Sequence, residues 1–195
     1  MFDGFWTHLT YQSGVLAAWV NSIATAVLIV GLILNWLAIR ASARAAMMQL
    51  MQERFNSLSM LGARAALAWL ILHPSQDAAS GRGGIPKFGW IVIDFLNQVA
   101  LLVEANKLDF TDANVAFSAH ALKIWGYASW RMQLKNDWLV GVYAPFVRLC
   151  EEMKAVEPLR IANDNYSNEA TISFWECESS LLESHQLKLL LNLLD

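Results

Sequence analysis

The sequence predicts an all-α protein: one N-terminal transmembrane helix followed by a small cytosolic helical bundle and a C-terminal amphipathic helix. Three observations lead to this fold class. Residues 14–39 are uncharged, apolar and free of proline. Beyond them, apolar residues recur every three or four positions, the spacing of one helix face. Prolines and glycine-rich stretches separate these periodic segments, and the length remaining after the apolar run suits one compact domain.

The uncharged run 14–39, preceded by a short tail over residues 1–13, is expected to cross a lipid bilayer. As a helix it reaches roughly 39 Å, more than the ~30 Å hydrocarbon core. A single segment in lipid satisfies its backbone hydrogen bonds only as a helix. Arg40 and Arg44 follow the run, and the positive-inside rule keeps them cytoplasmic. We therefore expect a protein of the bacterial inner membrane with its N-terminus outside and its C-terminal domain in the cytoplasm.

The competing interpretation of the same run is a cleaved secretory signal peptide. Ala41, Ser42 and Ala43 resemble a small-residue cleavage site. A signal peptide also has a basic start and an apolar core of about 7–15 residues. This chain has neither feature, so the membrane anchor is favoured.

One face of the predicted span carries small and polar residues. Small residues at four-residue intervals let two helices approach closely in lipid, and a buried amide tends to hydrogen-bond across helices. The candidate residues for helix association are Gly14, Ala18, Asn21, Ser22, Thr25 and Ala26. This face predicts self-association or a membrane partner, against the alternative that small residues gathered there by chance.

The cytosolic domain is expected over residues 40–156. Four helices are predicted within it, over residues 40–72, 87–105, 112–129 and 131–155. The first continues the span without a break and stops before Pro74, because a residue that precedes proline leaves the α region. The second is apolar almost all round and is therefore central. Pro145 predicts a kink or break in the fourth.

The remaining chain divides into a linker over residues 157–172 and an amphipathic helix over residues 173–195. Phe174, Cys177 and Leu181 are expected on the inner side of that helix. Its apolar tip can pack on its own domain or on a neighbouring protein, and both alternatives stay open.

Asp94 is a candidate buried charge, because it stands alone among apolar residues in the predicted central helix. A buried carboxylic acid has either a raised pKa or a cationic partner. The ion pair is the favoured interpretation, and the possible partners are Arg64, Lys123 and Arg131.

The sequence offers no set of residues for catalysis, and we expect no enzyme, no cofactor and no bound metal. It has no metalloprotease, hydrolase, dinucleotide or phosphate-loop motif. The two cysteines, Cys150 and Cys177, lack metal-site spacing, and His120 has no second ligand three or four residues away. A net charge of −3 with scattered cations argues against a nucleic-acid partner.

Three segments carry a resemblance to a known family: residues 51–67, residues 89–115 and residues 130–149. They combine an aromatic helix, a short turn of lysine or asparagine with an aspartate, and paired aromatic helices. In this order the chain resembles a bacterial family of single-pass membrane proteins of unknown function, the domain-of-unknown-function 4760 type. The resemblance implies an architecture, but no activity and no functional residues.

These observations predict a membrane-anchored helical interaction or scaffold module without catalytic activity. Its expected partners are the lipid bilayer and a protein, either a second copy or a larger inner-membrane assembly, bound through the transmembrane and C-terminal helices. The alternative is an oligomeric membrane effector or channel, gated by the cytosolic domain, in which Asn21, Thr25 and Asn35 line a path for ions.

Overall fold

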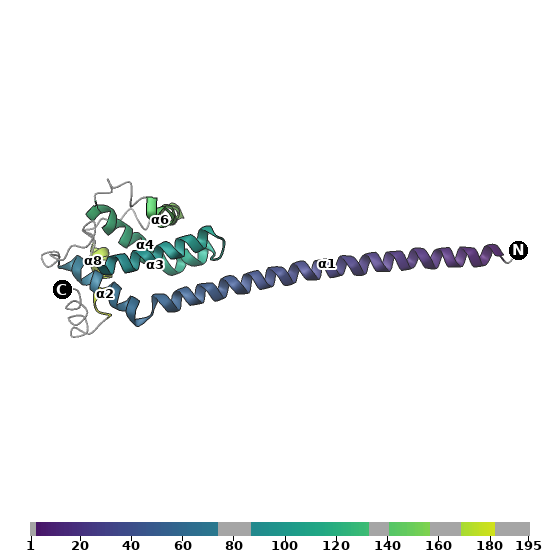
Figure 1. Ribbon diagram of the computed structural model, residues 1–195, viewed down its shortest axis with the longest axis horizontal. Helices are drawn as coiled ribbons and strands as arrows, with labels where there is room; N and C mark the ends of the chain where they lie inside the picture. Colours follow the sequence, from purple (N-terminus) through teal and green to yellow (C-terminus); the bar gives the residue numbers. More distant parts are fainter. Residues whose placement is uncertain (1–2, 74–86, 133–140, 157–168, 182–195) are drawn as a thin grey trace. The chain divides into compact units, whose positions relative to one another are not determined.

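The computed structural model describes residues 3–73, 87–132, 141–156 and 169–181 (Figure 1). All regular structure in these ranges is helical, which confirms the all-α fold class. The chain forms two compact units, Met1–Ala43 and Arg44–Asp195. The predicted loop over residues 75–84, most of the predicted linker and the chain after residue 181 lie outside the described residues.

The first unit is helical from Asp3 onward and belongs to α1, Asp3–Phe55. Every side chain described in this unit, over residues 16–43, is exposed. Its large apolar residues leave about half or more of their surface uncovered, as Leu16 at 69% and Leu37 at 48% illustrate. By length and composition α1 is the one helix in the described part of the chain that could cross a membrane.

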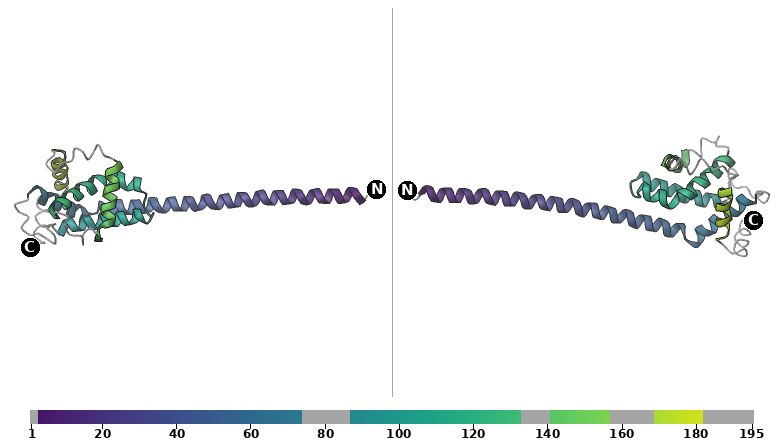
Figure 2. Two further views of the ribbon diagram at one scale, coloured as in Figure 1. Left: turned by 90° about the horizontal axis from the view of Figure 1, so that it is seen from above. Right: turned by 180° about the vertical axis from the view of Figure 1, so that it is seen from behind.

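The second unit is a bundle built around α3, Lys87–Glu104. This helix packs against α2 (Leu58–Leu72), α4 (Phe110–Met132) and α6 (Ala144–Val156), while α8 (Glu169–Ser179) packs on α2. Figure 2 shows the same bundle from two further directions. The central position predicted for the helix over residues 87–105 is confirmed.

The predicted helix over residues 40–72 is wrong in one respect, because it is two helices. α1 ends at Phe55 and α2 begins at Leu58. Ser57 has an extended backbone with φ −65° and ψ 151°, and its hydroxyl accepts a hydrogen bond from the Met60 amide at 3.4 Å. This is the geometry of a helix N-cap, which needs no glycine or proline to end one helix and start another.

The turn between α3 and α4 lies between the two helices predicted over residues 87–105 and 112–129. Asn106 has a positive φ of 54°, the left-handed conformation that often ends a helix and that asparagine tolerates. The Asp109 carboxylate then accepts a hydrogen bond from the Thr111 amide at 2.9 Å at the start of α4. α6 begins one residue before Pro145, and a turn at Tyr143 separates it from the helical residues 141–142, so the predicted break near Pro145 is confirmed.

The C-terminal amphipathic helix differs from its prediction in position and in phase. α8 begins at Glu169, inside the predicted linker 157–172, and ends at Ser179. Its inner side carries Thr171, Trp175 and Glu178, which are all buried, whereas Cys177 is exposed. The predicted inner stripe through Cys177 is therefore wrong, because a glutamate that the pattern assigned to solvent lies inside.

Candidate functional site

Asp94, the candidate buried charge, is exposed on α3, so this prediction is wrong. Its carboxylate accepts a hydrogen bond from the Tyr143 hydroxyl at 2.6 Å. Burial and this hydrogen bond raise the pKa of the Tyr143 phenol. A carboxylate at the surface needs no cationic partner, because water solvates it.

Among the described residues of the bundle, the buried charged side chains are Arg64 on α2 and Glu178 on α8. Two guanidinium nitrogens, Nε and Nη2, donate to the two carboxylate oxygens of Glu178, each at 2.7 Å. Only 8% and 9% of the two side chains is exposed. A fork of two parallel hydrogen bonds between charged groups is both strong and directional, so this pair determines how α8 sits on α2.

His120 on α4 completes the cluster. Its Nε2 lies 3.0 Å from the Glu178 Oε1 atom, and 16% of its side chain is exposed. The imidazole contacts two phenyl rings edge-on, Phe55 at 4.8 Å and Phe174 at 5.1 Å between ring centres. The carboxylate of Glu178 therefore joins α2, α4 and α8 at one point inside an aromatic shell.

A second contact fixes the other end of α8. The Lys123 ammonium on α4 donates to the Thr171 hydroxyl at 2.9 Å and lies 5.8 Å from the centre of the Phe174 ring. The Arg64 guanidinium lies 4.2 Å from the centre of the Phe55 ring. We call Phe55, Arg64, His120 and Lys123 the α8 seat: three cationic or ionisable groups and one aromatic ring that receive a helix carrying Phe174, Trp175 and Glu178.

The charge state of Glu178 follows from this geometry. Burial alone would raise the pKa of its carboxyl, but hydrogen bonds from His120 and Arg64, together with their charges, outweigh it and lower the pKa from 4.5 to about 2. Glu178 is therefore ionised at neutral pH, where its carboxylate pairs with Arg64.

Acid is expected to weaken the bundle between about pH 4.5 and about pH 2. The pKa of Glu178 is depressed in the folded state, so the unfolded state binds the proton first and stability is lost as the pH falls through this window. A change of one in a pKa corresponds to about 1.4 kcal/mol, so the loss is on the order of 3 kcal/mol. Denaturant unfolding of the full chain in detergent at several pH values measures it.

Glu178→Gln is the control for this pH dependence. It cannot ionise, so it should be less stable than the wild type at neutral pH and should lose less stability on acidification. Equal losses for the two proteins between pH 4.5 and pH 2 would contradict the assignment of the depressed pKa to Glu178.

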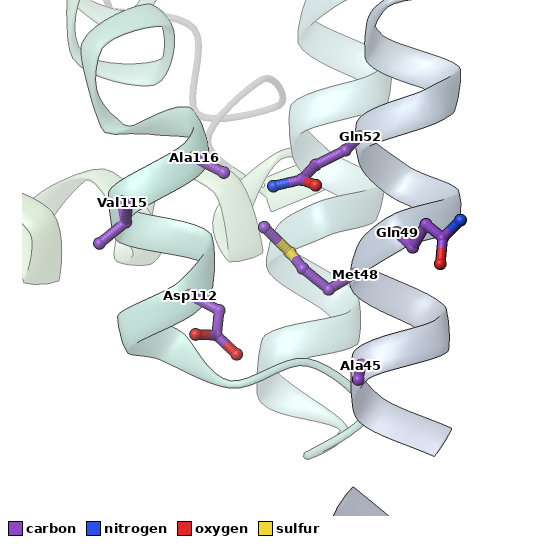
Figure 3. Close-up of a pocket in the computed structure, with 7 residues that line it drawn as sticks. All are labelled: Ala45, Met48, Gln49, Gln52, Asp112, Val115 and Ala116. Atoms are coloured by element: carbon purple, nitrogen blue, oxygen red, sulfur yellow. The ribbon is translucent and has the colours of Figure 1, made fainter. Parts of the chain in front are cut away.

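A groove of about 510 Å³ lies elsewhere on the second unit, between the last turns of α1 and the start of α4 (Figure 3). Met48, Gln52 and Asp112 point into it, whereas Val115 points away. Its lining residues are Ala45, Met48, Gln49, Gln52, Asp112, Val115 and Ala116. One carboxylate beside amides and apolar groups provides neither a nucleophile with its base nor a set of metal ligands.

The cysteines and histidines do not form a further site among the described residues. No group of three or more histidine, cysteine, aspartate or glutamate side chains there could hold a metal ion. Cys150 is fully buried and its thiol donates to the Ala121 carbonyl at 3.7 Å. Burial raises the pKa of this thiol, which disfavours the thiolate needed of a nucleophile.

The residues proposed for helix association all lie on α1, in the first unit. The Ser22 hydroxyl donates to the Ala18 carbonyl at 2.9 Å, and the Thr25 hydroxyl donates to the Asn21 carbonyl at 2.8 Å. Both hydroxyls are thus satisfied within the helix. No hydrogen bond of the Asn21 carboxamide is seen with any described residue.

The pairing of Arg64 with Glu178 is the feature that sequence analysis missed. The sequence does indicate that Arg64 needs a partner, because this arginine interrupts the apolar run of α2 and a buried arginine requires a carboxylate. Its partner lies 114 residues away along the chain, beyond the reach of any helical periodicity.

Comparisons of this chain with protein-family profiles, with characterised proteins and with solved structures gave no match. The resemblance to a family of single-pass membrane proteins therefore stays a prediction.

Proposed function

We propose that this protein is a membrane-anchored interaction module that self-associates through the small-residue face of its span. The observation that carries the proposal is the surface of α1 between residues 14 and 26. At about 100° per residue, its six small or polar positions fall within roughly 140° of the helix circumference. Side chains on the rest of the unit are mostly large and apolar, and they are exposed.

The hydrogen bonds on this face support close packing between two helices in lipid. Ser22 and Thr25 turn their hydroxyls back onto the helix, so neither hydroxyl needs a partner on a second helix. The Asn21 carboxamide has no hydrogen-bond partner among the described residues, and it is proposed to bond to the same residue of a second copy, as polar side chains in membranes often do. The Arg40 guanidinium lies 5.4 Å from the centre of the Trp36 ring, a pair suited to anchoring the cytoplasmic end of the span.

In the second unit, the described residues bring together no nucleophile with a base and no set of metal ligands. We therefore base the proposed role of this unit on how its helices are held together. Its polar cluster of Arg64, His120 and Glu178 is enclosed by helices and aromatic rings. Such a cluster orients helices with respect to one another. The span is proposed to lie in the bacterial inner membrane with this unit in the cytoplasm, following the arginines that succeed it.

Ala18→Leu is expected to weaken self-association about tenfold, because a bulky side chain separates the two backbones at the contact. Ala24→Leu is the matched control: it makes the same change about 60° outside the proposed face. Static light scattering of the detergent-solubilised full chain at several concentrations measures the change. A wild-type protein that remains a monomer throughout, or equal effects of the two variants, would contradict the proposal.

A further inference from the structure

Asn35 is a second amide in the predicted span, and it shares a line along α1 with Asn21. It follows Asn21 by 14 residues, which is two heptads. In a straight helix two positions with this spacing drift apart by about 40°, and the 3.5-residue repeat of a left-handed helix pair removes the drift. Both side chains are exposed in the structure. A second helix that crosses α1 in this sense therefore contacts both amides.

Both amides fall at depths where lipid offers no hydrogen bond. Measured along the helix axis from the middle of residues 14–39, Asn21 lies about 8 Å to one side and Asn35 about 13 Å to the other, and half of the hydrocarbon core is about 15 Å thick. Neither carboxamide forms a hydrogen bond with a described residue, whereas Ser22 and Thr25 donate to their own helix. An unpaired amide in hydrocarbon is costly, so both positions favour a hydrogen-bonding partner on another helix.

The surface of α1 next to Asn35 is occupied by a different contact. The Arg40 guanidinium lies 5.4 Å from the centre of the Trp36 ring, and these two residues lie about 100° and about 140° around the helix from Asn35. Such a pair suits the headgroup region. Leu28 and Leu32, each 69% exposed, continue the line between the two asparagines, so the line stays clear of this pair.

A second copy of the chain complements both amides at once. An asparagine amide donates and accepts, so it can bond to an identical amide. Copies of one chain insert in one orientation, so their spans are parallel, and a symmetric pair places each asparagine opposite its own counterpart. A different partner helix would need amides at the same two depths.

We propose that Asn35 forms a second interhelical hydrogen bond with the same residue of a second copy, and that the two spans cross with a left-handed sense. We call the contact the asparagine line; its residues are Ala18, Asn21, Thr25, Leu28, Leu32 and Asn35. This inference rests on the proposed function, because self-association through the small-residue face brings the two spans together.

Asn35→Leu is expected to weaken self-association about tenfold, because it removes one interhelical hydrogen bond. Two further variants, each made in the Asn35→Leu chain, move the amide. Leu28→Asn returns an amide to the asparagine line and should restore affinity to within about threefold of the wild type. Leu34→Asn places it at nearly the depth of Asn35 but about 100° around the helix, and should restore none. Static light scattering of the detergent-solubilised full chain at several concentrations compares the four proteins.

Ala18→Leu separates this inference from the proposed function. If Ala18→Leu weakens association but Asn35→Leu stays within about twofold of the wild type, the asparagine line is overturned and the proposed function stands. Equal restoration by Leu28→Asn and Leu34→Asn, or restoration by neither, also overturns the line, because the position of the amide would then not matter. A wild-type protein that remains a monomer overturns both. Restoration by Leu28→Asn alone supports the line.

Discussion

Arg64→Ala is expected to lower the free energy of unfolding by about 3–5 kcal/mol, the range seen when one member of a buried ion pair is removed. The substitution leaves the Glu178 carboxylate, 9% exposed, with His120 as its remaining hydrogen-bond partner in the cluster. It also removes the guanidinium from the face of the Phe55 ring. Urea unfolding of the full chain in detergent, followed by near-ultraviolet circular dichroism, measures the loss.

Arg148→Ala is the matched control for this experiment. Arg148 pairs with Glu104 at 2.7 Å, the same distance as the buried pair, but 56% and 40% of these two side chains is exposed. Exposed ion pairs contribute about 0–1 kcal/mol, because water solvates the charges and competes with the contact. If Arg64→Ala destabilised the protein no more than Arg148→Ala, the buried cluster would not hold α8 on the bundle.

Replacing both members of the buried pair distinguishes the attraction between the two charges from the cost of burying an unpaired charge. A chain with Arg64→Met and Glu178→Leu leaves no charge inside, so it should be more stable than Arg64→Ala. It should also lose the selection of one α8 orientation, since apolar side chains lack the directional fork. Stability and orientation are therefore separate roles of the cluster.

The parts of the fold that follow local rules could be predicted from the sequence. The apolar run of α1, the central helix α3 and its end at Asn106 each depend on residues within a few positions of one another. Asparagine in the left-handed conformation and an aspartate cap need no tertiary contact to form. These features appear in the structure close to where the pattern places them.

The α8 seat could not be predicted in the same way, because its residues come from helices far apart in the sequence. The pattern of α8 permits two inner faces: one through Phe174 and Cys177, and another through Thr171, Trp175 and Glu178. The second face places a glutamate inside, which periodicity alone disfavours. It becomes the inner face because Arg64 and His120 compensate the buried charge, and that compensation is visible only in three dimensions.

Phe55 and Leu58 show how the structure departs from the predicted continuous helix over residues 40–72, in which a spacing of three residues would place both side chains on one face. The cap at Ser57 separates them: Phe55 is 5% exposed at the end of α1, whereas Leu58 is 83% exposed at the start of α2. The Phe55 ring packs against Phe95 at 5.2 Å and Phe117 at 5.3 Å between centres. It also borders the cluster that holds α8.

Phe55→Ala is therefore expected to cost about 3–5 kcal/mol of unfolding free energy, from the lost burial and the cavity left between the rings. Leu58→Ala, made three residues away, should change stability by less than about 0.5 kcal/mol, as exposed substitutions usually do. The same urea titration compares them. Because Phe55 also forms one wall of the α8 seat, its removal should speed deuterium exchange in α8 more than in α6, whereas a purely global loss of stability would raise both equally. Equal effects of the two substitutions would contradict the burial of Phe55 and the exposure of Leu58.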